Sequence, residues 1–178
     1  MVSTIAILSA AGLSLFLVWT LLRPGLPQIG SLEDWEAKRH EVDLAVLRIL
    51  IDPGEERYLR SLFSPPEYRR MMRRRLTLAL NSLGLIGENA AMLMKLGQLA
   101  KAGANPALAQ EADELSHGAL RLRVNLMLVE PYLRVKWLFP GWTLSVPAFE
   151  MPYEELLSYL NRLRQQQQWE LSQALRAG

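Results

Sequence analysis

The sequence predicts an all-α protein, in which an N-terminal transmembrane helix precedes a helical bundle built on a long antiparallel helical hairpin. Three observations indicate this fold. Residues 2–22 are uncharged and mostly apolar, two long segments repeat apolar residues at alternating spacings of three and four, and no stretch alternates like a strand. The 178 residues include no cysteine, which excludes disulfides, thiolate metal sites and cysteine nucleophiles.

The first element is a membrane anchor over residues 1–23. Val2 to Leu22 has about the 20 residues that a helix needs to cross a bilayer, and no basic start of the kind that opens a cleaved signal peptide precedes it. Trp19 and Arg23 suit the interfacial end of such a helix. Because basic residues lie only on its C-terminal side, at Arg23 and then at Lys38 and Arg39, we expect the N-terminus outside the cell membrane and the bulk of the chain in the cytoplasm.

A soluble helical bundle is predicted over residues 31–178, after a Pro- and Gly-containing linker at residues 24–30. Ser31, with Asp34 three residues later, predicts the start of one helix that runs to about Ile51. Its inward face is predicted to carry Trp35, Val42, Val46 and Ile49, and to be widened in its second half by Leu44, Leu47 and Ile51. Asp52 predicts a shorter helix that ends before Pro65, and a C-terminal helix is expected over residues 152–175.

The hairpin is predicted over residues 65–138. Ser64, Pro65 and Glu67 have the pattern of a helix N-terminus, Gly103 ends the first arm, and Pro106 starts the second. The first arm's seam consists of Met72, Leu76, Ala79, Leu83, Ile86, Ala90, Leu93, Gly97 and Ala100, and the second arm's seam consists of Leu108, Ala112, Leu115, Ala119, Leu122, Leu126, Val129 and Leu133.

The two seams can be paired, because residues that face each other in a folded hairpin have position numbers with a nearly constant sum. The pairs predicted in this way include Gly97 with Ala112, Ala90 with Ala119, Leu83 with Leu126 and Leu76 with Leu133. The small residues favour a hairpin that is tightest near its tip. The first arm also carries a second apolar row at Met71, Leu78, Leu85, Met92 and Leu99, so the other helices are expected to cover it; any part left bare would be a partner site.

Two constellations could carry chemistry. Glu114 and His117 have the helical spacing of a carboxylate-bridged metal site, but the second copy and the further carboxylates that such a site needs are missing. Glu88 interrupts an apolar helix, as a buried general acid or base would, yet it shares a polar strip with Arg74 and Lys95. A solvated or salt-paired role is the simpler interpretation of both, so no cofactor or metal is expected.

The densest charge cluster, which consists of Arg69, Arg70, Arg73, Arg74 and Arg75, lies at the open end of the hairpin. The candidate lipid- or partner-binding residues there are Arg69, Arg70, Arg73, Arg74, Arg134, Lys136, Trp137 and Trp142. Basic side chains mixed with aromatic ones suit an anionic membrane surface. A solvated face that acidic neighbours neutralise explains the cluster equally well. Nucleic-acid binding is disfavoured by a net charge of only +2 on a membrane-anchored chain.

The sequence carries no signature of a known family, phosphate loop, nucleophile elbow or zinc-binding spacing. We therefore expect a single-pass, membrane-anchored, non-enzymatic protein that binds other protein subunits as a scaffold or accessory subunit of a membrane complex. The alternatives are a metal or cofactor protein or enzyme that uses Glu114 with His117, or Glu88, and a module that binds anionic lipid.

Overall fold

The computed structural model describes residues 29–102, 106–142, 153, 155–162 and 164–165. This part of the chain contains no strand and is helical, as predicted. Its helices are α2 (Leu32–Lys38), α3 (Leu44–Ile51), α4 (Pro53–Leu62), α5 (Pro65–Ala102) and α6 (Pro106–Leu138), and residues 155–162 form a further helical segment. The predicted membrane span lies outside the described residues, as does most of the linker.

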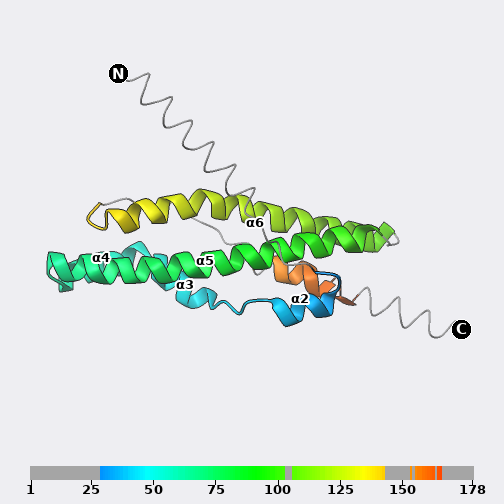
Figure 1. Ribbon diagram of the computed structural model, residues 1–178, viewed down its shortest axis with the longest axis horizontal. Helices are drawn as coiled ribbons and strands as arrows, with labels where there is room; N and C mark the ends of the chain where they lie inside the picture. The colour runs from blue at the N-terminus through cyan, green and yellow to red at the C-terminus, as the bar shows by residue number, and fades with distance from the viewer. Residues whose placement is uncertain (1–28, 103–105, 143–152, 154, 163, 166–178) are drawn as a thin grey trace, which may run out of the picture.

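The long antiparallel hairpin is present: α5 and α6 lie side by side along the length of the bundle (Figure 1). The two predicted seams form its core. The fully or nearly fully buried residues on them are Met72, Leu76, Ala79, Leu83, Ile86, Ala90, Leu93, Ala112, Leu115, Ala119, Leu122, Leu126, Val129 and Leu133. Burying aliphatic side chains at a helical spacing is what holds two such helices together.

Contacts near the tip of the hairpin show the antiparallel register. Lys101 of α5 pairs with Asp113 of α6 at 2.7 Å. One turn further in, a Cβ added at Gly97 would lie 2.7 Å from the backbone oxygen of Ala112, so the two backbones approach closely where the sequence places these small residues. Gly97 is therefore required by packing rather than by its backbone conformation.

The helices α2, α4 and α5 begin where the sequence indicates. The side chain of Ser31 accepts a hydrogen bond from the backbone N–H of Asp34 at 3.2 Å, and Asp52 accepts one from that of Glu55 at 3.0 Å. At the start of α5 the carboxylate of Glu67 accepts the backbone N–H of Ser64 at 3.1 Å. Each contact satisfies a backbone donor that the first turn of a helix leaves without an intrahelical partner.

The single helix predicted from residue 31 to about Ile51 is wrong, because the chain forms α2 and α3 with residues 39–43 between them. Asp43 starts α3 as a cap, accepting from the N–H of Val46 at 3.0 Å. The break changes the register of the second half. Val46 and Ile49, predicted to face inward, are exposed, whereas Leu47, predicted on the wider part of that face, is buried.

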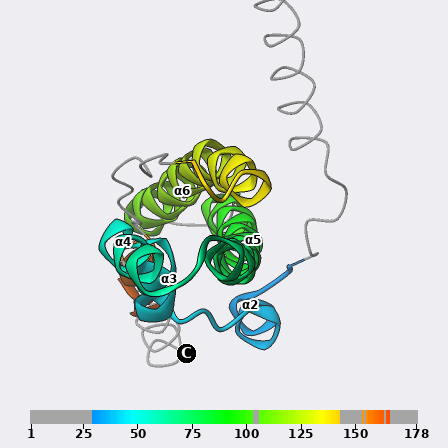
Figure 2. The ribbon, with the colours of Figure 1, turned by 90° about the vertical axis from the view of Figure 1, so that its left-hand side faces the viewer.

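The helices α2, α3 and α4 each pack against α5, whereas α6 lies at the edge of the bundle (Figures 1 and 2). Two arms of similar length are thus covered differently. Among the described helices only α5 is long and apolar enough to cross a membrane by length and composition, and half of its most apolar stretch is buried inside the bundle. That burial is expected of a core helix.

The segment of residues 155–162 packs on α6 at Gly118, where an added Cβ would lie 3.1 Å from a methyl carbon of Leu156. Arg162 pairs with Glu111 of α6 at 3.3 Å. Arg164, beyond the segment, pairs with Glu36 of α2. The C-terminal part therefore joins the second arm to the first short helix and closes the bundle on that side.

Candidate interaction surfaces and the pocket on α6

The arginines predicted to bind lipid or a partner lie at the N-terminal end of α5. The side chains of Arg69, Arg70, Arg73 and Arg74 are all exposed there. The structure brings one of them to the aromatic cluster: the guanidinium of Arg73 lies 5.8 Å from the ring centroid of Trp137. The indole N–H of Trp137 donates to the hydroxyl of Thr77 at 3.1 Å, which fixes the ring between the two arms.

Aromatic side chains continue this end of the hairpin beyond α6. Phe139 and Trp142 stack with ring centroids 4.8 Å apart, and both are exposed. Arg60 of α4 donates to the backbone oxygen of Gly141 at 3.3 Å and so holds the turn that carries them. Exposed rings with this support keep their apolar faces available to another surface.

The two remaining basic candidates are placed differently from the exposed arginines. Arg134 is half-buried and pairs with Glu130 on the same helix at 2.9 Å. Lys136 is only 2 % exposed and bonds to the carboxylate of Glu56. Glu56 also accepts the hydroxyl of Tyr68 at 3.0 Å, and burial raises the pKa of that hydroxyl. Lys136 thus belongs to an internal polar network that joins α4, α5 and α6, and it cannot reach a lipid or partner.

Arg75, the fifth arginine of the cluster in sequence, has a structural role that sequence reasoning missed. Its buried guanidinium donates to the backbone oxygens of Ile49 and Leu50, and the distance to Leu50 is 2.6 Å. The Ile49 oxygen also accepts the backbone N–H of Asp52 at 3.2 Å. Because the last carbonyls of a helix have few intrahelical donors, Arg75 caps the end of α3 from α5. Burial lowers the pKa of Arg75.

An exposed apolar face runs along α6 on the side away from α5. Leu128, at its centre, is 71 % exposed, the most exposed of the described large hydrophobic residues. The residues of this face, which we call the α6 ridge, are Leu120, Val124, Met127, Leu128, Pro131, Val135 and Leu138. Single exposed leucines are ordinary, but a row of apolar residues along one helix face forms a continuous patch, and such patches mark contact sites.

A second exposed apolar patch lies where α3 meets α5. Met71 and Leu78 stand on the same face of α5 as Arg75, which bonds to the end of α3, and both are exposed. Val46 and Ile49 are exposed on α3 itself. We call these four residues the α3–α5 patch. Met92, from the same row of the first arm, is buried, so the neighbouring helices cover the predicted row only in part.

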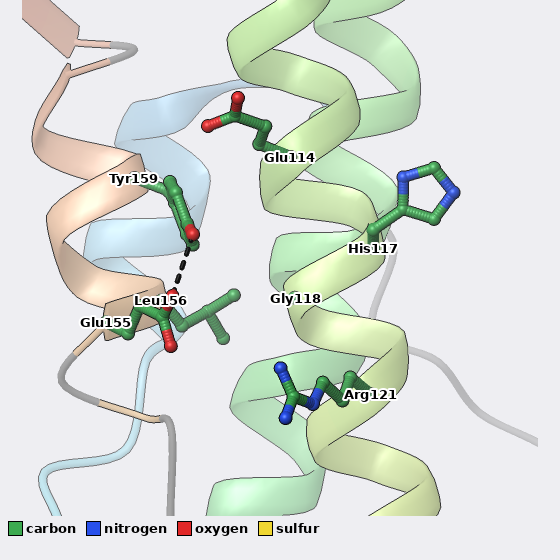
Figure 3. Close-up of a pocket in the computed structure, with 7 residues that line it drawn as sticks. All are labelled: Glu114, His117, Gly118, Arg121, Glu155, Leu156 and Tyr159. Carbon is green, nitrogen blue, oxygen red and sulfur yellow. Dashed lines mark hydrogen bonds between the residues drawn. The ribbon is translucent and has the colours of Figure 1, made fainter.

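Glu114 and His117 line a hollow of about 250 Å³ between α6 and the C-terminal segment (Figure 3). The carboxylate of Glu114 lies 3.5 Å from the guanidinium of Arg162. His117 points away from the C-terminal segment and is exposed, with its nearest carboxylate, Asp113, at 3.6 Å. The hydroxyl of Tyr159 donates to Glu155 at 2.8 Å. These side chains do not converge on a common point.

Within the described ranges no group of three histidine, aspartate or glutamate side chains is placed to hold a metal ion. Glu88 is exposed and pairs with the imidazole of His40 at 2.9 Å. The neighbouring Asn89 is fully buried, and it makes contacts that the sequence pattern did not indicate.

Asn89 binds both polar groups of the His40 backbone. Its amide oxygen accepts the His40 N–H at 2.8 Å, and its amide nitrogen donates to the His40 oxygen at 2.7 Å. The same nitrogen donates to the hydroxyl of Tyr153 at 2.9 Å. Asn89 therefore supplies hydrogen bonds that the non-helical residues 39–43 would otherwise lack, and it ties α5 to both flanking segments.

No protein-family model matches the chain, and neither does any curated protein or solved structure. The functional conclusions therefore depend on the surfaces described above.

Proposed function

We propose that this chain is a single-pass, membrane-anchored helical protein whose bundle binds another protein, as a non-enzymatic scaffold or accessory subunit of a membrane-associated complex. Val2 to Leu22 supplies the anchor, with the N-terminus outside and the bundle in the cytoplasm. The covered first arm supplies a rigid support. Glu88 and Glu114, the carboxylates considered for chemistry, are engaged in ion pairs within the bundle, which favours binding over catalysis.

The α3–α5 patch carries this proposal. Its four exposed apolar side chains come from two helices that Arg75 locks together, so the surface exists before a partner arrives. A preformed apolar patch loses little conformational entropy on binding. Arg48 and Arg74 are exposed beside it, so the matching surface would offer apolar side chains with carboxylates at its rim.

A photo-crosslinking amino acid placed at Leu78 in the full chain tests the proposal in native membranes. One discrete crosslinked product is expected, and the change Ile49→Asp should abolish it because a carboxylate within the patch opposes apolar contact. The matched control carries the same probe at Gln98, an exposed polar position on α5. A chain that purifies from mild detergent as a bare monomer and gives no product at Leu78 would contradict the proposal.

The metal or enzyme alternative has no comparable support. Glu114 faces Arg162, His117 faces solvent, and Glu88 pairs with His40 at the surface. The anionic-lipid alternative is favoured by a specific surface, the α6 ridge.

A further inference from the structure

The α6 ridge is long, apolar and bordered by positive charge. From Leu120 to Leu138 it extends about 27 Å at the rise of an α-helix. Arg121 lies on one side of it, and Arg123 and Arg134 lie on the other, as their helical positions require. Glu130, the one acidic residue of α6 after Glu114, is paired with Arg134. Basic flanks around an apolar face are the pattern of a helix that lies in a membrane interface.

The charges distinguish between the possible occupants of this face. A second copy seated on the ridge in either direction would bring arginines against arginines, and juxtaposed like charges oppose association. An anionic bilayer surface has the opposite property, because it attracts each cation and accepts apolar side chains at the boundary of its acyl chains. The helix α6 lies at one edge of the bundle (Figure 2), where its exposed face can meet an extended, deformable surface.

Aromatic side chains lie beyond the end of the ridge. Phe139 and Trp142 stack there and are exposed, whereas Trp137 packs toward α5 with Arg73 over its ring. Tryptophan rings beside arginines are enriched at the headgroup level of membranes. Three features of separate origin, the ridge, its basic borders and the aromatic end, thus favour the same kind of ligand.

The proposed anchor would keep this surface close to lipid. Ile29 is buried in the bundle, and five residues separate it from Arg23 at the end of the predicted span. The six steps along the chain from Arg23 to Ile29 span at most about 20 Å even when fully extended. So short a tether makes the second contact an intramolecular one, and a weak affinity for lipid then suffices to hold the bundle against the bilayer.

We propose that the α6 ridge, with Arg121, Arg123, Arg134 and the aromatic end, is a bilayer-contact surface that lays the bundle along an anionic membrane. The inference rests on the proposed anchor, and it leaves the α3–α5 patch open to a protein partner. The bundle would then work as a bridge, with lipid on one side and protein on another.

The test uses the full chain, which has no cysteine and therefore accepts a single label without background. An environment-sensitive fluorophore is attached to the variant Leu128→Cys, and the protein is reconstituted into vesicles of phosphatidylcholine with or without phosphatidylserine. We expect a blue shift of the emission that grows with phosphatidylserine. The control Leu78→Cys carries the label at an exposed position on α5, with 57 % of the residue accessible, and it should keep the emission of a water-exposed probe.

Removing positive charge tests whether attraction to the anionic lipid drives the contact. The double change Arg121→Gln and Arg123→Gln in the Leu128→Cys chain should abolish the dependence on phosphatidylserine while the helical circular dichroism is unchanged. Emission at Leu128→Cys that never shifts would overturn the inference. So would a shift that disappears when the protein is diluted in lipid, because it would show a second copy on the ridge.

Alkaline carbonate extraction of the same vesicles distinguishes a missing bilayer contact from a missing membrane anchor. A chain that washes out of the vesicles has no membrane anchor, and the proposed function fails with it. A chain that resists extraction but shows no shift at Leu128→Cys keeps its anchor and lacks only the bilayer contact.

Discussion

The two arms of the hairpin have similar length and share one seam, yet they differ in what surrounds them. The helices α2, α3 and α4 lie against α5, where Met92 of the second apolar row is buried and Leu85 is half-buried, although Met71, Leu78 and Leu99 stay exposed. The edge helix α6 has α5 on one side, Glu56 of α4 over its end at Lys136 and a short C-terminal segment at Gly118, and the α6 ridge stays exposed. Apolar residues on α5 are thus mostly explained by folding, whereas those on the outside of α6 are not.

The largest predicted effect is on folding stability, and it should differ between the two faces of α6. Leu122 is fully buried against α5, so Leu122→Ala should lower the free energy of unfolding by about 4 kcal/mol through lost burial and a residual cavity. Leu128→Ala, on the ridge, should change it by less than about 0.5 kcal/mol. Urea unfolding of the full chain in mild detergent measures both. Equal losses would mean that the ridge is covered within the folded chain.

Asn89→Ala should be the costliest polar change on α5. It leaves the N–H and oxygen of His40 without their partners in a part-buried site and removes a hydrogen bond from Tyr153, so a loss of about 3 kcal/mol is expected. In this variant the rate of amide hydrogen exchange should increase at His40 while the rates in α6 stay nearly unchanged. A uniform rise along both arms would show that Asn89 supports the whole hairpin instead.

Substituting two glycines of α5 by alanine should change the stability of the chain in opposite directions. Gly97→Ala would place a Cβ 2.7 Å from the backbone oxygen of Ala112, and forcing the arms apart should cost about 2 kcal/mol. Gly84→Ala meets nothing within 4 Å, so it should stabilise the chain by up to about 1 kcal/mol through helix propensity. Thermal melts of the two variants check this. Stabilisation by both would contradict the close approach of α5 and α6.

The smallest predicted effect is a loss of folding stability at alkaline pH. Burial raises the pKa of the Tyr68, Tyr132 and Tyr153 hydroxyls. Because the folded chain then holds these protons more tightly than the unfolded chain, their contribution to stability is complete below the ordinary tyrosine pKa of about 10 and is lost as the pH rises through the folded values. The urea midpoint should therefore fall as the pH is raised past that value, and Tyr153→Phe should reduce the fall.

The same contrast between the arms explains how much could be predicted from sequence. The seams, the caps and the start of each arm follow from local periodicity, and residues such as Leu83 and Leu126 are buried as the spacing requires. In the break at residues 39–43, the backbone of His40 bonds to Asn89, 49 positions away, and no local sequence pattern reports such a contact. The amide of Asn89, placed among apolar positions of α5, was the available signal.

The candidate surface was predicted only in part, and for the same reason. Exposed arginines and tryptophans gather at the open end of the hairpin, as composition indicates. Lys136 is buried because Glu56, 80 residues away, neutralises it, and Arg75 is buried because the end of α3 needs donors. The α6 ridge could not be recognised from sequence, since its residues look like a second core face until the neighbouring helices are placed.

Collision accessibility along α6 tests the central claim most directly. Spin labels placed one at a time at Leu120, Val124, Leu128 and Val135 of the full chain, in vesicles that contain phosphatidylserine, report contact with lipid-soluble oxygen and with a water-soluble nickel complex. Oxygen should reach all four labels and nickel should be excluded, whereas a label at Leu78 should be open to nickel. If nickel reaches Leu128 as readily as Leu78, the α6 ridge faces water and the bilayer contact does not exist.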